Sequence, residues 1–85
     1  MVDSKYLNRI VELYNMRNKS PITPAAMDAV IAWLSENEEL TKKYEMRIFG
    51  GLNEGLTVEY LTPNLDVSID WDNKGNMDAT TSNIE

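Results

Sequence analysis

The amino-acid sequence predicts an α+β fold, in which two N-terminal helices pack on one face of a four-stranded antiparallel β-meander of order 1-2-3-4. Apolar residues recur at helical spacing up to about residue 37, and from Tyr44 onward they alternate with polar residues, as in a strand. The connections between the strand-like runs are short, so successive strands are expected to be antiparallel neighbours. A chain of 85 residues is expected to form one domain, here 1–85.

The first helix is predicted over about residues 4–18. Asp3 or Ser4 precedes it as a capping residue. The helix is expected to end before Pro21, because a residue that precedes proline avoids the helical region. The predicted apolar stripe consists of Leu7, Ile10, Val11 and Tyr14, with Tyr6 and Leu13 beside it.

The second helix is predicted over about residues 24–37. Thr23 is a favourable N-cap, and Pro24 follows at the first helical position, where its missing N–H costs nothing. This helix is apolar around much of its circumference and is expected to be the more deeply buried one. Its end is expected near Glu38-Glu39, where acidic side chains interact unfavourably with the helix dipole. The predicted stripe consists of Met27, Val30, Ile31 and Leu34.

Strands are predicted at about 44–49, 56–61, 65–72 and 76–81, followed by a loose tail at 82–85. The third strand has the cleanest alternation in the chain. Trp33 and Trp71 are predicted to be core anchors, although Trp71 lies beside an acidic turn and also has the features of a binding hot spot. The predicted core face consists of Met46, Ile48, Leu56, Val58, Tyr60, Leu65, Val67, Ile69 and Trp71.

The composition removes several functional classes. The chain has no cysteine and no histidine, and so lacks thiolate chemistry and the commonest general base and metal ligand. A net charge of −6 disfavours direct binding to nucleic acid. No apolar run approaches the ~18 residues of a membrane span. The first residues lack the layout of a secretory signal, so the cytoplasm is the expected compartment.

The acidic third strand and the turn after it suggest two kinds of chemistry, and neither pattern is complete. A calcium loop that began at Asp70 would carry Lys74 at a ligand position and Thr81 in place of the bidentate acid. Asp70 and Asp72 would lie about 6–7 Å apart, but on an exposed sheet face, where nothing raises a pKa. The sequence therefore predicts neither a metal or other cofactor nor enzymatic activity.

The net charge is confined to the predicted sheet. From Gly50 onward one basic residue, Lys74, faces seven acidic ones, and 1 − 7 = −6 is the charge of the whole chain. An acidic sheet face either serves solubility or recognises a basic partner. The residues predicted to bind a partner are Glu59, Asp66, Asp70, Asp72, Trp71 and Asp78.

The layout as a whole resembles that of small acidic accessory proteins of phages and other mobile elements. The features that carry the resemblance are two helices followed by a meander with turns at Gly50-Gly51, at Asn53-Glu54-Gly55 and at Asp72-Asn73-Lys74-Gly75. The resemblance implies a protein that binds and inhibits or modulates a larger partner. It implies no particular functional residue.

Three functions follow as hypotheses. The leading one is a non-enzymatic protein that occupies a basic surface on a protein partner through its acidic sheet face, as an anti-defence protein or a nucleic-acid mimic would. The alternative is a structural, assembly or immunity-type module that acts through homo- or hetero-oligomerisation. The third is a small-molecule binder with a pocket near Trp33, Tyr60 and Trp71.

Overall fold

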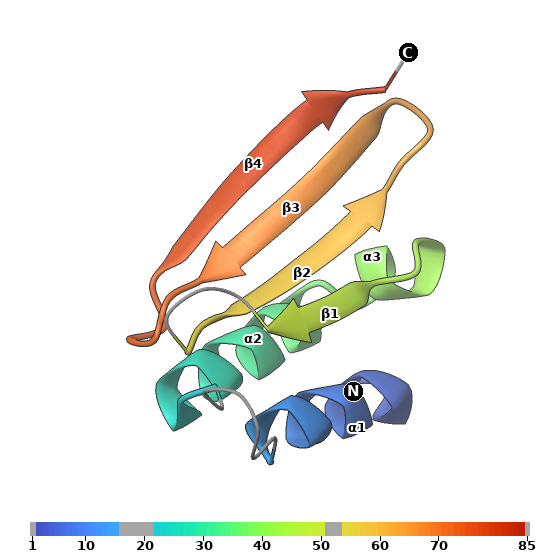
Figure 1. Cartoon of the computed structure of the whole chain (residues 1–85). Coiled ribbons are helices and arrows are strands. Elements are labelled where there is room, and N and C mark those ends of the chain that lie inside the picture. Colours follow the sequence, from blue (N-terminus) through green and yellow to red (C-terminus); the bar gives the residue numbers. More distant parts are fainter. Residues whose placement is uncertain (1, 16–21, 51–53, 85) are drawn as a thin grey trace.

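The computed structural model describes residues 2–15, 22–50 and 54–84. The helices come first in the chain and a four-stranded antiparallel sheet follows, so the predicted α+β fold is confirmed (Figure 1). The elements are α1 (Ser4–Tyr14), α2 (Pro24–Glu36), α3 (Glu38–Lys43), β1 (Arg47–Gly50), β2 (Leu56–Leu61), β3 (Leu65–Trp71) and β4 (Met77–Asn83).

The sheet has the order β1-β2-β3-β4, and all of its neighbours are antiparallel. Val58 pairs with Ile48 on one side and with Ile69 on the other, so the apolar residues of the inner strands share one face. The helices cover this face only (Figure 1). The core forms between the helices and this face, and no described helix covers the opposite face (Figure 1).

The buried side of α1 differs from the predicted stripe. Tyr6, Ile10 and Leu13 are buried, whereas Val11 is 49% exposed and Tyr14 is 39% exposed. On this buried side, the Tyr6 hydroxyl accepts a hydrogen bond from the Met46 N–H at 3.0 Å, which ties α1 to the chain just before β1. α1 ends at Tyr14, and the remainder of the predicted helix, from residue 16 onward, lies outside the described residues.

The helix α2 begins and packs as its sequence predicts. The Thr23 hydroxyl accepts a hydrogen bond from the Ala26 N–H at 3.2 Å, which caps the first turn. Ala26, Val30 and Leu34 are completely buried. Met27 and Ile31, which belong to the predicted stripe, are half-buried and pack against the edge of this core.

A short third helix follows where the sequence predicted only the end of the second. α2 ends at Glu36, and the Asn37 side chain donates a hydrogen bond to the Trp33 carbonyl at 2.8 Å. The chain then begins α3, so Glu38-Glu39 lie in a first turn and Lys42-Lys43 in a last turn. The predicted unfavourable interaction with the helix dipole is therefore wrong, because both charge pairs have the favourable sign for α3.

Two strand boundaries differ from the prediction. β1 begins at Arg47, not near residue 44, because the Tyr44 N–H still bonds the Leu40 carbonyl at 2.8 Å and completes α3. β4 continues to Asn83, so the predicted tail is wrong at residues 82 and 83. Ser82 pairs with Asp66 and Asn83 with Leu65, which extends the ladder to the end of β3.

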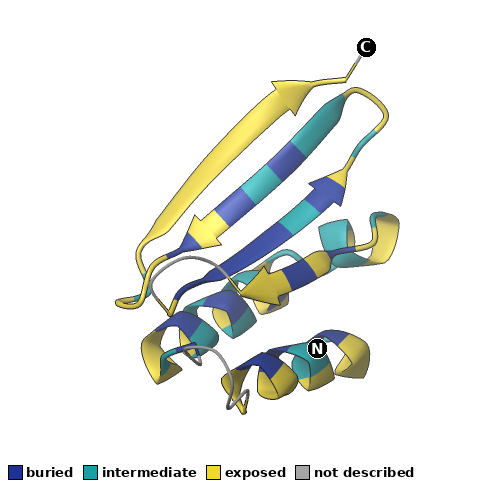
Figure 2. Ribbon diagram, in the orientation of Figure 1, coloured by how far each residue is buried: buried dark blue, intermediate teal, exposed yellow. Residues whose placement is uncertain are grey.

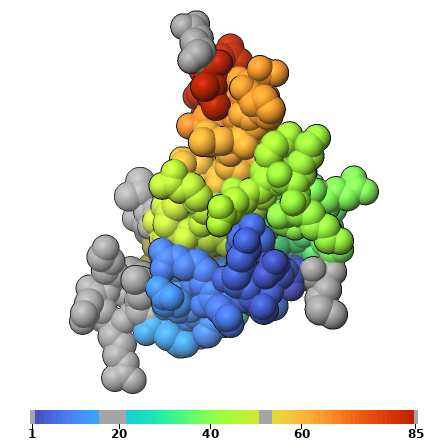
Figure 3. Space-filling model, turned by 90° about the vertical axis from the view of Figure 1, so that its right-hand side faces the viewer, coloured from blue at the N-terminus to red at the C-terminus, as the bar shows by residue number. Residues whose placement is uncertain are grey.

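The helical layer is narrower than the sheet. α2 packs on β2 and β3 and α1 packs on β1, while no described helix packs on β4. Every residue of β4 is exposed, and Figure 2 shows this strand in a single colour from end to end. From the side, the ends of β3 and β4 project beyond the helices (Figure 3). The helices therefore cover the sheet from β1 to β3, whereas β4 is open on both faces.

The turn between β3 and β4 is fastened to the start of α2. The Thr23 hydroxyl donates a hydrogen bond to the Asn73 carbonyl at 2.6 Å. Gly75 adopts a φ of 87°, and a Cβ atom there would lie 3.0 Å from the Ala25 carbonyl oxygen. Glycine is required at this position both by the backbone conformation and by the close approach of the helix.

Replacing Gly75 by alanine should lower the free energy of unfolding by about 1–2 kcal/mol, the usual cost of a left-handed conformation for a residue with a Cβ atom. Gly50→Ala is the matched control, because no atom of the described residues lies within 4 Å of a Cβ atom at that position. Urea unfolding of both variants measures the difference. Equal stability of the two variants would contradict this account of the turn.

Candidate protein-binding face

The outer face of the sheet, which carries the predicted acidic surface, is organised in three rows that run across the strands. Rows are two residues apart along each strand, about 7 Å. Each row contains at least one carboxylate, and Glu59, Asp66, Asp70 and Asp78 are hereafter called the acidic face. The rows consist of Leu61, Asp66 and Ser82, then of Arg47, Glu59, Ser68 and Thr80, and then of Phe49, Thr57, Asp70 and Asp78.

Asp70 and Asp78 lie directly opposite each other on β3 and β4. Carboxylates in this position repel one another and destabilise a sheet. Asp70 also accepts a hydrogen bond from the Thr57 hydroxyl at 2.6 Å, which fixes the orientation of its carboxylate. Thr57 is 5% exposed whereas Asp70 is exposed, so the bond is partly buried. The pair is thus held in place although it is unfavourable.

Little positive charge on this face offsets the carboxylates. Arg47 is the one basic residue on the outer side of the described strands, and its guanidinium lies 3.4 Å from Glu59. The Arg47 side chain is 70% exposed, and such a pair contributes little to stability. The contact nevertheless directs the positive charge to Glu59 and leaves Asp66, Asp70 and Asp78 without a basic neighbour across the described strands.

The acidic face has a second unfavourable feature, besides the facing pair of Asp70 and Asp78, and it lies at Asp66. Its Oδ1 atom is shielded from solvent and accepts no hydrogen bond from any described residue. A desolvated charged oxygen without a donor costs free energy in the isolated protein. Two of the three rows therefore hold carboxylates in arrangements that folding alone does not favour.

Asp72, which was predicted with this group, belongs to the turn after β3. Its Oδ1 accepts hydrogen bonds from the Lys74 and Asn76 N–H groups, each at 2.9 Å, and its Oδ2 accepts one from the Asn76 side chain at 3.1 Å. The backbone N–H of Asn76, followed by that of Lys74, lowers the pKa of Asp72 below its usual value. Its carboxylate is therefore occupied in holding the turn together.

Trp71 points away from the acidic face. It is 4% exposed, and its ring meets Trp33 edge-on with the ring centres 5.8 Å apart. The structure therefore gives it the position of a core anchor. Tyr60 is also buried and stacks on Tyr44 at 5.9 Å. The rings of Trp33, Tyr60 and Trp71, around which a small-molecule pocket was predicted, pack against core side chains.

The accessible apolar groups of the outer face are Phe49 and Leu61, which sequence reasoning did not assign. Phe49 is 39% exposed beside Thr57, and Leu61 is 53% exposed beside Asp66. Both alternate along their strands in step with the carboxylates, and this alternation in the sequence could have placed them on the outer face. Exposed apolar groups next to charges are typical of protein-binding surfaces, where aromatic residues are enriched.

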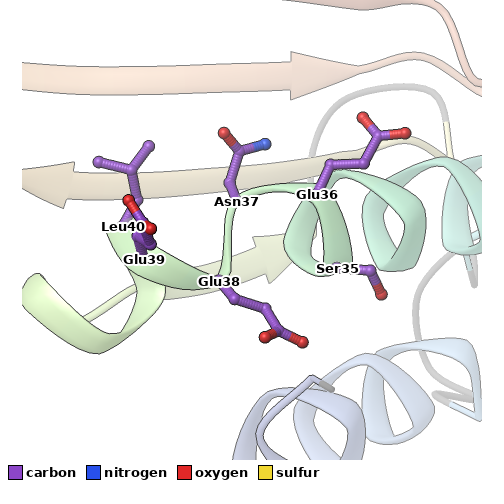
Figure 4. Close-up of a pocket in the computed structure, with 6 residues that line it drawn as sticks. All are labelled: Ser35, Glu36, Asn37, Glu38, Glu39 and Leu40. Carbon is purple, nitrogen blue, oxygen red and sulfur yellow. The ribbon is translucent and has the colours of Figure 1, made fainter.

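Other parts of the described structure offer less to a ligand. A hollow at the junction of α2 and α3 is lined by Ser35 to Leu40, but the side chains diverge (Figure 4). Those of Glu36 and Asn37 point to one side of the backbone, and those of Ser35 and Glu38 point to the other. Within residues 2–15, 22–50 and 54–84, no three acidic side chains converge as metal ligands would.

No helix among these described residues has the length and apolar character that crossing a lipid bilayer requires. A comparison of the chain with protein-family models, with curated proteins and with solved structures finds no match.

The lowered pKa of Asp72 predicts an acid-dependent part of the stability. Because the pKa of Asp72 is lower in the folded protein than in the unfolded chain, its carboxylate stabilises the fold. This contribution is complete at pH values above the unfolded pKa of about 3.9, and it disappears as the pH falls through the folded pKa. Wild type should therefore be more stable than Asp72→Asn at pH 7, and the gap should close in acid. Thermal unfolding from pH 7 to pH 2 measures it. A gap that is independent of pH would refute this role.

The opposition of Asp70 and Asp78 predicts a stabilising substitution. Asp78→Asn should raise the free energy of unfolding by about 0.2–1 kcal/mol, because it removes one of two facing charges. The gain should shrink at high salt, which screens the repulsion. Glu45→Gln is the matched control, since it removes one exposed carboxylate that lies outside the helices and strands. If both variants gain equally in urea unfolding, net charge and not the facing pair is the cause.

Proposed function

We propose that this chain is a non-enzymatic binding protein that uses the acidic face to occupy a basic surface on a larger protein. The observation that carries the proposal is the pair of facing carboxylates, Asp70 and Asp78, which has no basic neighbour across the described strands. Sequences usually agree with the fold at every level, and residues that break a local rule are expected at functional sites. A cationic side chain of a partner would attract both carboxylates and so offset their mutual repulsion.

The rest of the outer face supports the same partner chemistry. The carboxylates lie in three consecutive rows on strands that are held by pairing on both sides, except at β1 and β4. A rigid array requires little ordering upon binding. Phe49 and Leu61 flank the array and supply apolar contact area. Opposite charge would speed association and make it sensitive to salt.

The effect on the partner is proposed to be inhibition or modulation. The layout resembles that of small acidic accessory proteins of phages, and a row of carboxylates is suited to a groove that otherwise handles nucleic acid. An anti-defence role in the cytoplasm is the specific form of this proposal. Asp72 and Trp71 are left out of the binding face, because Asp72 stabilises the turn and Trp71 lies in the core.

The test is affinity capture from the native host with three baits. These are the wild type, the face variant Asp66→Asn/Asp70→Asn/Asp78→Asn, and the helix variant Asp28→Asn/Glu36→Gln/Glu39→Gln. The two variants lose the same charge, and the helix variant loses it from exposed positions on α2 and α3. Quantitative mass spectrometry should find a protein that wild type and helix variant retain and the face variant loses.

The affinity of that protein should then be measured over a range of salt concentrations. Each exposed ion pair contributes ~0.2–1 kcal/mol, so the face variant should bind roughly tenfold more weakly and show a flatter salt dependence. If the face and helix variants bind equally well, the acidic face has no role in binding. In that case the charge serves only solubility.

A further inference from the structure

The two edges of the sheet differ in a way that the acidic face does not explain. At the β1 edge, side chains of α1 satisfy the backbone. Tyr6 accepts a hydrogen bond from the Met46 N–H at 3.0 Å, and the Arg9 guanidinium donates to the Ile48 carbonyl at 2.8 Å. Met46 and Ile48 are two residues apart, so both backbone groups point away from β2. The first helix thus closes this edge.

The β4 edge has no such cover. The Asp72 N–H bonds the Asn76 carbonyl, and the Ile84 N–H bonds the Asn64 carbonyl, each at 3.0 Å. These two bonds lie at opposite ends of the β3–β4 ladder, and hydrogen-bonded pairs alternate between them. Asp78, Thr80 and Ser82 therefore bond to β3. The outward-facing backbone groups belong to Met77, Ala79, Thr81 and Asn83.

Nothing in the described structure satisfies or protects these outward groups. None of its hydrogen bonds reaches them, no described helix packs on β4, and all seven residues of the strand are exposed (Figure 2). Edge strands are usually protected by lysine, proline or a bulge. β4 has the sequence Met-Asp-Ala-Thr-Thr-Ser-Asn and pairs with β3 without interruption. It is a regular, open template for another strand.

We propose that β4 pairs antiparallel with β4 of a second copy of this chain, which joins the two sheets into one. The twofold axis passes midway between the Thr80 residues of the two copies. In this register Met77 faces Asn83 of the second copy, and Ala79 faces its Thr81. All four outward-facing residues of each strand are then used, and each such pair exchanges both of its backbone hydrogen bonds.

Charge and length favour this register and this occupant. Asp78 faces Ser82 of the second copy, so a carboxylate meets a hydroxyl and not its own equivalent. Centring the axis on Asp78 would oppose two like charges and leave Asn83 unpaired. The seven residues of β4 match seven residues of the second copy without an overhang. Both acidic faces would lie on the same side of the joined sheet.

This inference is independent of the proposed function and predicts the opposite response to salt. Each copy carries a net charge of −6, so the two copies repel one another. Salt screens this repulsion and should strengthen the dimer, whereas it should weaken binding of the acidic face to a basic partner. Failure of one proposal is thus distinguishable from failure of the other.

Cysteine cross-linking tests the register, because the chain has no natural cysteine. Thr80→Cys places the thiol on the axis, in a pair without hydrogen bonds and with Cα atoms about 4.5 Å apart, within disulfide range. Ser82→Cys is the matched control on the same face, and its two copies would lie about 13 Å apart. Under oxidised glutathione, Thr80→Cys should form the covalent dimer at least about tenfold faster.

Sedimentation of the full chain tests the edge itself. Wild type should show a concentration-dependent dimer that high salt strengthens. Thr81→Pro removes an outward N–H that β3 does not use, and edge strands tolerate proline at such positions. It should weaken the dimer at least about tenfold, whereas Thr81→Val keeps the N–H and should not. Circular dichroism checks that both variants fold.

Several results would overturn the proposal. These are a wild type that is monomeric at all concentrations, equal cross-linking of the two cysteine variants, and a dimer that Thr81→Pro leaves unchanged. If wild type is monomeric and Thr81→Pro instead loses a captured host protein, the edge accepts a strand from that protein and not from a second copy. If Thr81→Pro fails to fold, the cysteine pair decides the outcome.

Discussion

The packing of α2 on β2 and β3 is the interaction on which the rest of the structure depends. Ala26, Val30 and Leu34 are completely buried against this part of the sheet, and so are Leu56 and Val58 beneath them. Because side chains alternate along a strand, burying one face sends every second residue to water. A slip of one residue would bury the carboxylates of β3. The hydrophobic core therefore also fixes the orientation of the acidic face.

Most of the fold could be predicted because the strands alternate strictly. The predicted bounds of β2 agree with the structure, and those of β3 differ by one residue. The orientation of α1 was harder to predict, because Tyr6, Ile10 and Leu13 form an apolar stripe that overlaps the predicted one. The predicted stripe included Val11 and Tyr14, whereas the buried one includes Tyr6, whose hydroxyl accepts a hydrogen bond from the Met46 N–H. Such a contact joins residues forty positions apart in the chain, and no local pattern reports it.

The candidate site was only partly predictable for a related reason. Alternation placed Glu59, Asp66 and Asp70 on one face, but the opposition of Asp70 and Asp78 depends on the register across a turn. The same turn withdraws Asp72, whose carboxylate accepts backbone N–H groups. Neither the exposure of all of β4 nor the closure of β1 by Arg9 follows from composition. Both depend on a helical layer that is narrower than the sheet.

The narrow helical layer also connects the two proposed surfaces. β4 contributes Asp78 to the acidic face and its backbone to the open edge, so one uncovered strand serves both. In an isolated copy, β4 keeps two unfavourable features, namely the facing carboxylates of Asp70 and Asp78 and the outward backbone groups without a partner in the described structure. A helix that covered the β4 edge would have removed only the second of these. Joining two such strands satisfies the backbone and leaves both acidic faces open on one side. A cationic surface would offset the remaining repulsion, and in the proposed dimer the joined sheet would present two arrays to that surface at once, which would strengthen binding without any new contact.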